Sequence, residues 1–245
     1  MLMQSLQHYW SGSFLAANGF IALNMLGALL LGMLVGYERS YQGRAAGMRT
    51  YGLVCMASTA LTIFSGFAPL WYGGRGPQAA ADPTHVIQGI VTGIGFLGAG
   101  MIMKDGLSIR GLTTAASIWA VAAVGVLLGV GMYPAALVLA LLCALSMSLL
   151  HNLETRLPGR ATLDIRLTFR PGFKPDLEEV AHIAQARGYR VMRDSVTITF
   201  ADNQPVWRFG AMAVERSRAL SPTLLADELA AFEGVGKFTI TPVRN

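Results

Sequence analysis

The sequence predicts an α-helical integral membrane region with five spans, followed by a small α+β domain. Its mean hydropathy of +0.47, with only 13% charged residues, fits a water-soluble globule badly. The charges are also uneven, because residues 1–150 hold nine charged side chains and residues 151–245 hold 24. We therefore expect a membrane domain over residues 1–155 and a soluble domain over residues 160–245. This division excludes a soluble enzyme that fills the chain and an intrinsically disordered protein.

Uncharged stretches long enough to cross a bilayer give the expected positions of the spans. A span needs about 20 mostly apolar residues, because hydrocarbon offers no hydrogen-bond partner to an open backbone. The stretch over residues 111–153 lacks Asp, Glu, Lys and Arg. It is about twice the required length, and Gly131 and Pro134 interrupt it, so it predicts two helices. The five expected spans cover residues 14–37, 50–72, 86–103, 111–131 and 134–151.

The loop charges predict the orientation. Basic residues follow the first, third and fifth spans, whereas the second loop balances Arg75 with Asp82 and the fourth carries no charge. Positively charged short loops stay in the cytoplasm. We therefore expect the N-terminus outside and the C-terminus in the cytoplasm. A four-span arrangement would place the arginine-rich tail outside, so the charges favour five spans.

The pattern after Pro158 changes to that of a soluble α+β domain. Alternating apolar residues predict a strand over residues 162–170, and a helical pattern follows over 176–187. Two strands at 191–200 and 206–215, a helix over 221–234 and a strand over 237–243 complete the βαββαβ order. This order predicts the ferredoxin-like arrangement that ACT-type ligand-sensing domains also use. Such a fold does not by itself define a function.

Motifs of catalysis and of cofactor binding do not fit this chain. Residues 93–98 match GxGxxG, but they lie in an apolar helix rather than after a strand, so helix packing is the favoured interpretation. Cys55 and Cys143 lie in apolar runs and are expected to act as small hydrophobic residues. We expect no enzyme activity, no cofactor, no metal site and no nucleic-acid partner.

Small residues spaced by four predict close helix packing, because they let two backbones approach each other in a membrane. Such glycine faces also predict self-association. The pairs are Gly32 and Gly36, Gly89 and Gly93, and Gly125 and Gly129.

Charged residues gather at the expected cytoplasmic ends of the spans, and two interpretations remain open. They line a polar cavity in which acids pair with arginines, or they are loop charges that only set orientation. None of the three acids of the membrane region lies mid-span, which weakens a carboxylate-lined path for Mg²⁺. The residues are Glu38, Arg39, Arg44, Arg49, Lys104, Asp105 and Arg110.

Four segments together resemble the MgtC/SapB family of bacterial inner-membrane proteins. They are residues 36–39 (GYER), 46–50 (AGMRT), 88–100 (QGIVTGIGFLGAG) and 109–119 (IRGLTTAASIW). The resemblance covers about residues 20–150, and the ACT-like tail matches the family's longer members. Thr113 stands where the virulence-associated branch typically has Asn. The resemblance implies a functional membrane motif made of Glu38, Arg39, Arg49, Thr50, Gln88, Gly93, Gly95, Gly98, Gly100, Asp105, Arg110, Thr113, Thr114 and Trp119.

The resemblance implies a non-enzymatic protein needed for growth at low Mg²⁺ and, in intracellular pathogens, for survival in macrophages. The implied mechanism is inhibition of the F-type ATP synthase by contact within the membrane. A transporter of Mg²⁺ or another cation is the alternative, motivated by the clustered charges. A third hypothesis, motivated by the βαββαβ order, makes the tail a ligand sensor that gates the membrane part.

Overall fold

The computed structural model describes residues 10–71, 82–105, 108–156, 161–214 and 219–243. The chain divides into two compact units, residues 1–103 with 111–156 and residues 104–110 with 157–245. The first unit is helical with apolar helices, and the second contains an α+β sheet region. This arrangement confirms the general fold class that the sequence predicts. The expected limits at residues 1, 72, 160 and 245 lie outside the described residues.

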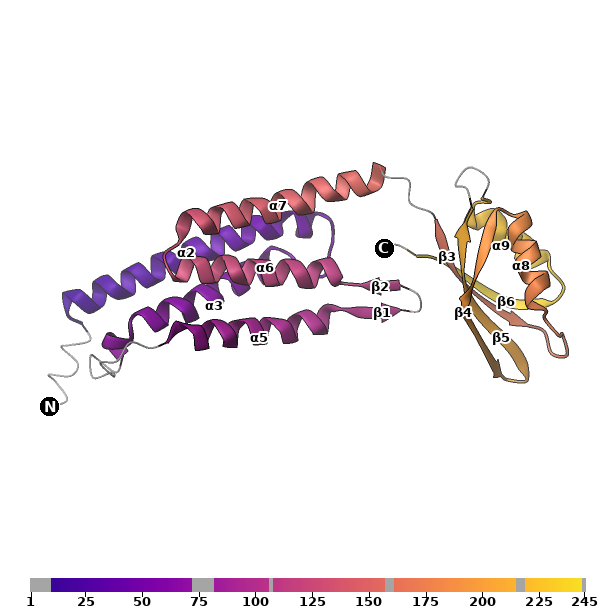
Figure 1. The fold of residues 1–245 in the computed structure, drawn as a ribbon, viewed down its shortest axis with the longest axis horizontal. Coiled ribbons are helices and arrows are strands. Elements are labelled where there is room, and N and C mark those ends of the chain that lie inside the picture. The colour runs from indigo at the N-terminus through magenta and orange to yellow at the C-terminus, as the bar shows by residue number, and fades with distance from the viewer. Residues whose placement is uncertain (1–9, 72–81, 106–107, 157–160, 215–218, 244–245) are drawn as a thin grey trace. The chain divides into compact units, whose positions relative to one another are not determined.

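The described part of the helical unit contains five long helices (Figure 1). Each overlaps one expected span, and a short 3-10 helix, η1 (Ala68–Leu70), follows the second of them. By length and composition α2, α5 and α6 are able to cross a membrane, and α7 carries a shorter apolar segment, Tyr133–Leu149. The helices are α2 (Gly12–Tyr41), α3 (Met48–Gly66), α5 (Pro83–Met101), α6 (Leu112–Gly129) and α7 (Tyr133–Arg156).

Local sequence signals explain where these helices begin and end. Helix α5 begins at Pro83, and the Thr84 backbone N–H donates to Asp82 Oδ1 at 2.8 Å, which caps the helix. Hydrogen bonds from the Thr84 hydroxyl and N–H also hold the pKa of Asp82 below its usual value. Gly111 and Gly131 adopt left-handed φ angles of 89° and 81° next to the two ends of α6, a conformation that favours glycine.

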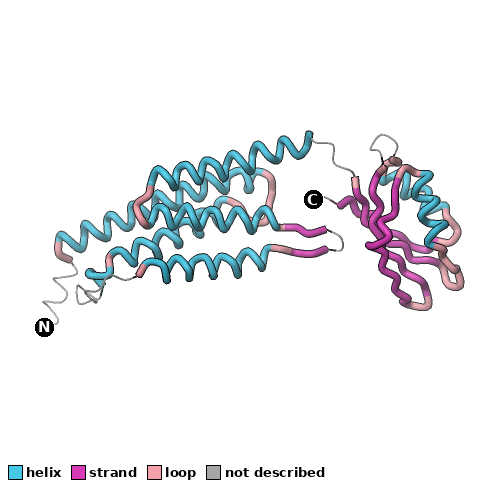
Figure 2. Tube along the Cα trace, viewed as in Figure 1, coloured by secondary structure: helices cyan, strands magenta, loops and turns pink. Residues whose placement is uncertain are grey.

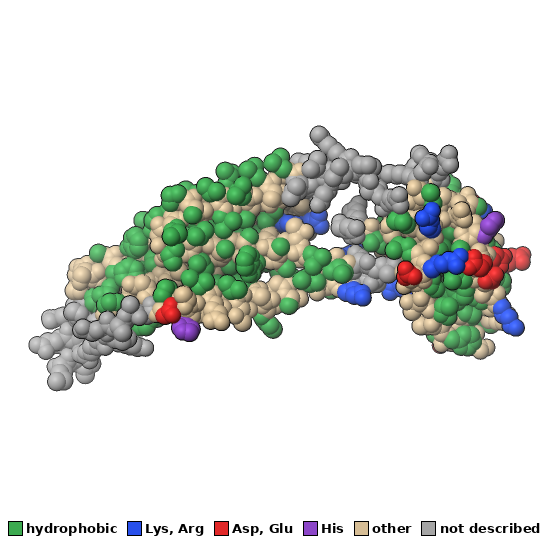
Figure 3. Space-filling view, viewed as in Figure 1, with side chains coloured by type: hydrophobic (Ala, Val, Ile, Leu, Met, Phe, Trp, Pro, Cys, Tyr) green, Lys and Arg blue, Asp and Glu red, His purple; other side chains and the backbone are tan. Residues whose placement is uncertain are grey.

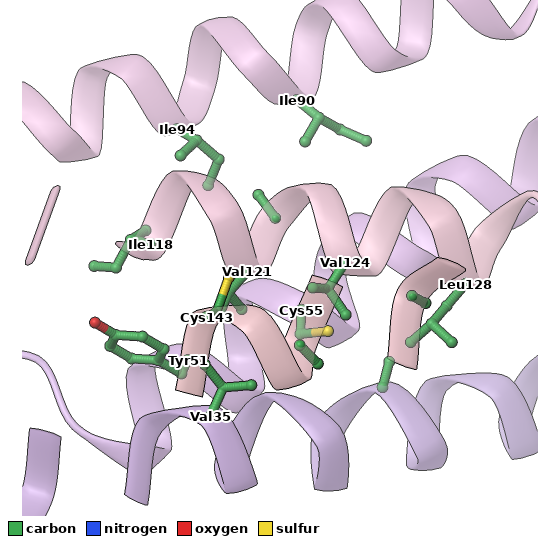
Figure 4. Packing of buried hydrophobic residues seen from close by; sticks show 14 of the residues in the cluster. Val35, Tyr51, Cys55, Ile90, Ile94, Ile118, Val121, Val124, Leu128 and Cys143 are labelled. Carbon is green, nitrogen blue, oxygen red and sulfur yellow. The ribbon is translucent and has the colours of Figure 1, made fainter. Parts of the chain in front are cut away.

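Helix α3 packs against α2, α5 and α6, and α6 packs against all four other long helices. Tyr51 and Cys55 of α3 are fully buried and meet Val35 of α2 and Val124 of α6 in one apolar cluster (Figure 4). Many large apolar side chains of this unit are exposed, among them Phe96 at 80%, and Figure 3 shows apolar side chains spread over the face in view. Such a surface is suited to hydrocarbon, where apolar side chains need no burial inside the protein.

A short hairpin connects α5 to α6 where the sequence predicts only a basic loop. Its strands are β1 (Met103–Asp105) and β2 (Ser108–Arg110), which pair with each other. Strands of three residues carry too little alternation to be recognised in a sequence. Lys104 lies in β1 and Arg110 in β2.

The second unit contains a sheet, drawn in magenta in Figure 2. It has four strands in the order β4-β5-β3-β6, and all neighbouring strands pair antiparallel. Its element order, strand–helix–strand–strand–helix–strand, agrees with the sequence pattern. Helices α8 and α9 cover one face of the sheet (Figure 1). The elements are β3 (Thr162–Phe169), α8 (Leu177–Ala186), β4 (Tyr189–Ala201), β5 (Gln204–Ala213), α9 (Pro222–Ala231) and β6 (Val235–Val243).

The strand register places one apolar row beneath the two helices. Ile165 of β3 lies opposite Phe209 of β5 on one side and Ile240 of β6 on the other. Asp176 and Ser221 cap α8 and α9 by accepting hydrogen bonds from backbone N–H groups of the first turns. The packing of both helices on this row forms the core of the second unit.

Candidate functional site

The charged members of the predicted motif lie at the ends of helices and in the hairpin. Glu38 and Arg39 lie in the last turn of α2, and Arg49 and Thr50 are exposed in the first turn of α3. Arg110 is exposed in β2, and Asp105 belongs to β1. The described residues form three ion pairs, and all three lie in the second unit. The described charged side chains at the helix ends and in the hairpin therefore form no ion pair. Glu38 therefore pairs with no described arginine, and the Asp105 side chain lies outside the described residues, so the hypothesis of paired acids stays untested there.

One carboxylate oxygen of Glu38 is buried without a hydrogen-bond partner among the described residues. Glu38 Oε1 accepts a hydrogen bond from Gln42 Nε2 at 2.7 Å. Its Oε2 is buried and has no hydrogen-bond partner among the described residues. A buried carboxylate oxygen without a partner is costly, so this atom is positioned to accept a donor or a cation.

Arg39 takes part in a buried polar chain that joins four helices. The residue is 6% exposed, and its Nε donates to Met147 Sδ of α7 at 3.4 Å. Its guanidinium also interacts with the Tyr51 hydroxyl of α3, which hydrogen-bonds Ser117 of α6. Ser117 Oγ donates to the Thr114 carbonyl at 2.9 Å, which leaves the Tyr51 hydroxyl as the donor toward Ser117. The chain therefore runs from a buried cation to a backbone carbonyl.

The sequence predicts only part of this polar chain. Arg39 and Thr114 belong to the predicted motif, and both are buried. Tyr51 and Ser117 are missing from that motif, although a buried hydroxyl in an apolar helix needs a partner. A tyrosine directly after Arg49 and Thr50 was the available signal.

Two glycine pairs bring helices together as their spacing predicts. A Cβ added to Gly32 would lie 2.6 Å from the Tyr51 carbonyl oxygen, and one added to Gly125 would lie 2.4 Å from the Cys55 carbonyl oxygen. A Cβ added to Gly36 would lie 2.9 Å from the Met48 Cα, and one added to Gly129 would lie 2.5 Å from the Thr62 Cβ. These contacts let α2 and α6 approach the backbone of α3 from two sides.

The third pair does not pack against any described residue. A Cβ added to Gly89 or Gly93 would meet no described atom within 4 Å, and the same holds for Gly95 and Gly100. Gly98 meets only the Ala115 Cβ, at an ordinary 3.6 Å. Gly89 and Gly93 therefore make no close helix contact with the described residues of this chain, and their predicted packing against another chain stays a prediction.

Helix α5 uses a single narrow stripe to pack against the bundle. Its buried residues are Ile90, Ile94 and Gly98. Figure 4 shows Ile90 and Ile94 projecting from α5 toward α6. Val86 and Met101 are partly buried against the same cluster, whereas residues 91–93, 95–97 and 99–100 of α5 are exposed.

Another face of α5 combines glycines with one exposed aromatic ring. Gly89, Gly93, Phe96 and Gly100 recur at spacings of four, three and four, which places them on one side of a helix. All four are exposed. We call these four residues the open α5 face.

The remaining residues of the predicted motif flank this face or lie on α6. Gln88 is exposed on α5, and its carbonyl accepts a hydrogen bond from the Thr92 hydroxyl at 2.8 Å. On α6, Thr113 is exposed and Trp119 is 54% exposed. In the ranges that the structure describes, no group of three or more His, Cys, Asp or Glu residues is placed to hold a metal ion.

The model of the MgtC family matches residues 25–156. Protein MgtC of Brucella abortus is 45% identical over 108 residues, which cover 44% of this chain and 42% of the relative. Protein MgtC of Salmonella typhimurium is 43% identical over 124 residues, which cover 50% and 49% respectively. The chain spans about half the length of the curated relatives it matches, and no solved structure matches it significantly. The family model covers the helices and hairpin that carry the predicted motif, and this chain belongs to the MgtC family.

Proposed function

We propose that this chain is a non-enzymatic bacterial inner-membrane protein that binds and regulates a membrane partner. The proposed partner is the F-type ATP synthase, and the proposed role is adaptation to low Mg²⁺ and survival in macrophages. The observation that carries this proposal is the open α5 face, whose three glycines have no described atom within 4 Å of an added Cβ.

Helix association in a membrane depends on close packing and on polar contacts, because lipid tails are as apolar as the helices themselves. The chain uses this device internally at Gly32 and Gly125, where backbones approach closely. On α5 the glycines are exposed and bracket Phe96. The glycines leave a shallow groove on the helix surface, and the Phe96 ring projects beside it. A second helix with small residues at its surface could pack closely against both. The exposed Gln88 next to them offers a polar contact.

The proposal includes five spans with the C-terminus in the cytoplasm. Helices α3 and α7 complete a bundle with the three helices that are long and apolar enough to span. The basic residues of the α2–α3 connection and of the hairpin support a cytoplasmic position for both. In this topology the second unit, whose strand order is compatible with a ferredoxin-like or ACT-like domain, lies in the cytoplasm.

A cation transporter is a second candidate, favoured by one specific observation. Glu38 Oε2 is buried without a hydrogen-bond partner among the described residues, and Mg²⁺ prefers oxygen ligands. Flux of Mg²⁺ into proteoliposomes that Glu38→Gln abolishes would support this candidate. Absence of flux above empty liposomes would remove it.

Co-purification of the ATP synthase with the tagged chain from native membranes tests the first proposal. Gly93→Leu fills the open α5 face and is expected to abolish co-purification, because a leucine side chain prevents close approach of a second helix. Gly27→Leu on α2 is the matched control, since Gly27 is also open. We expect this variant to co-purify normally. Equal co-purification of both variants, at equal membrane levels, would contradict the proposal.

A further inference from the structure

A cavity of about 170 Å³ lies between α8, α9 and the sheet face that they cover. Apolar side chains from all three elements line it. The sheet contributes Ile165 and Phe209, α8 contributes Ala184, and α9 contributes Leu225 and Leu229. The cavity lies within the second unit and shares no residue with the predicted membrane motif.

One ion pair forms the charged part of the lining. Arg187, which follows α8, donates from its Nε to Glu228 Oε2 of α9 at 2.6 Å. The two side chains are 35% and 44% exposed, so they mark the side of the cavity that faces solvent. Tyr189 also lines the cavity, but its hydroxyl donates to the Leu220 carbonyl at 2.7 Å. The polar groups available to a ligand are therefore one cation and one anion in contact.

The size and lining of the cavity select an apolar occupant. A site for ordered water needs two to four polar partners, whereas a dry apolar cavity of about 150 Å³ in another protein holds a benzene ring. The apolar part of this lining offers no such partners. The apolar part of a ligand with about six to eight carbon atoms would fill the cavity.

The Arg187–Glu228 ion pair indicates which polar group a ligand of this cavity would carry. A charged head of either sign would meet one like and one opposite charge at this neutral pair, which therefore gives it no net attraction. A hydroxyl group accepts a hydrogen bond from a guanidinium and donates one to a carboxylate. We propose that this cavity binds a compact apolar alcohol, with its body between α8, α9 and the sheet and its hydroxyl at the Arg187–Glu228 pair. The inference is independent of the proposed function of the membrane region.

Hydrogen exchange of the full-length protein in detergent micelles tests this inference, with benzyl alcohol as the probe. At ten times the dissociation constant, the slowest amides of β3 and β5 are expected to exchange about tenfold more slowly, because only the folded unit binds. Benzoate and benzylammonium are expected to bind at least tenfold more weakly. No protection by benzyl alcohol would overturn the inference, and equal protection by the charged probes would overturn the assignment of the head group.

Variants on α8 separate cavity binding from partition of the alcohol into micelles. Ala184→Leu fills the cavity and is expected to abolish protection, while Ala186→Leu adds the same volume at an exposed position of the same helix and should leave protection intact. Ala211→Val fills the cavity from β5 and repeats the test if Ala184→Leu lowers the unfolding midpoint. Undiminished protection in a folded, cavity-filled variant would overturn the inference.

Discussion

Replacing Gly125 by alanine is expected to destabilise the helical unit, although alanine favours a helix by about 0.5–1 kcal/mol over glycine. The new Cβ would lie 2.4 Å from the Cys55 carbonyl oxygen and 2.8 Å from the Ser58 Cβ. Overpacking of this kind costs about 1–3 kcal/mol. Displacing α6 also stretches the hydrogen bond from the Thr59 hydroxyl to the Gly125 carbonyl, now 2.9 Å long, which contributes about 1 kcal/mol. The expected net loss is about 1–3 kcal/mol.

Gly93→Ala is the matched control for this prediction. Gly93 also lies inside an apolar helix, but no described atom lies within 4 Å of the added Cβ. This variant therefore retains only the helix-propensity gain, about 0.5–1 kcal/mol. Helical circular dichroism during titration of dodecylmaltoside micelles with sodium dodecyl sulfate measures both free energies of unfolding. Equal stability of the two variants, or a Gly125→Ala variant as stable as wild type, would refute the packing argument.

Three further predictions concern the α6 entry and the second unit. Gly111→Ala is expected to lower the unfolding free energy by at least about 1–2 kcal/mol in the same titration, because Gly111 has φ 89°; an unchanged midpoint would contradict this. Asp164→Asn is expected to destabilise the second unit by about 1.5 kcal/mol in urea, because the buried carboxylate accepts three hydrogen bonds from Arg208. Arg193→Gln breaks the exposed ion pair with Glu178 and should lower the unfolding free energy by less than about 1 kcal/mol. Equal losses for Asp164→Asn and Arg193→Gln would refute the argument that the buried ion pair contributes more. Burial raises the pKa of Tyr189 above 10.0, so its contribution to stability is complete below the unfolded pKa and is lost as pH rises through the folded pKa; Tyr189→Phe should remove this loss, and an identical alkaline profile would show that another group causes it.

The sequence predicts the elements well because their signals are local. The strand over residues 162–170 follows from alternation, and the break at Gly131 follows from a glycine in the left-handed region. The β1–β2 hairpin is different, because its strands are stabilised by each other rather than by a pattern of their own. Short pairings of this kind depend on contacts that a sequence does not display.

Spacing alone does not reveal whether a glycine pair is used inside the chain. Gly89 and Gly93 have the same separation as Gly125 and Gly129, yet only the α6 pair touches a neighbouring helix. The atoms that crowd Gly125 and Gly129 belong to α3, which is distant from α6 in the sequence. Spacing within α6 therefore cannot reveal the contact. Tyr51 is missing from the predicted motif because its hydrogen-bond partner, Ser117, lies 66 residues away in the sequence.

Proton pumping by the F-type ATP synthase in inverted membrane vesicles tests the central claim most directly. We predict that the wild-type chain and Gly27→Leu lower ATP-driven acidification of the vesicles, and that Gly93→Leu at equal membrane levels does not. Both positions are open in the structure, so only the location of the added side chain differs. Inhibition by Gly93→Leu as strong as that by wild type would contradict the claim that the open α5 face binds the partner.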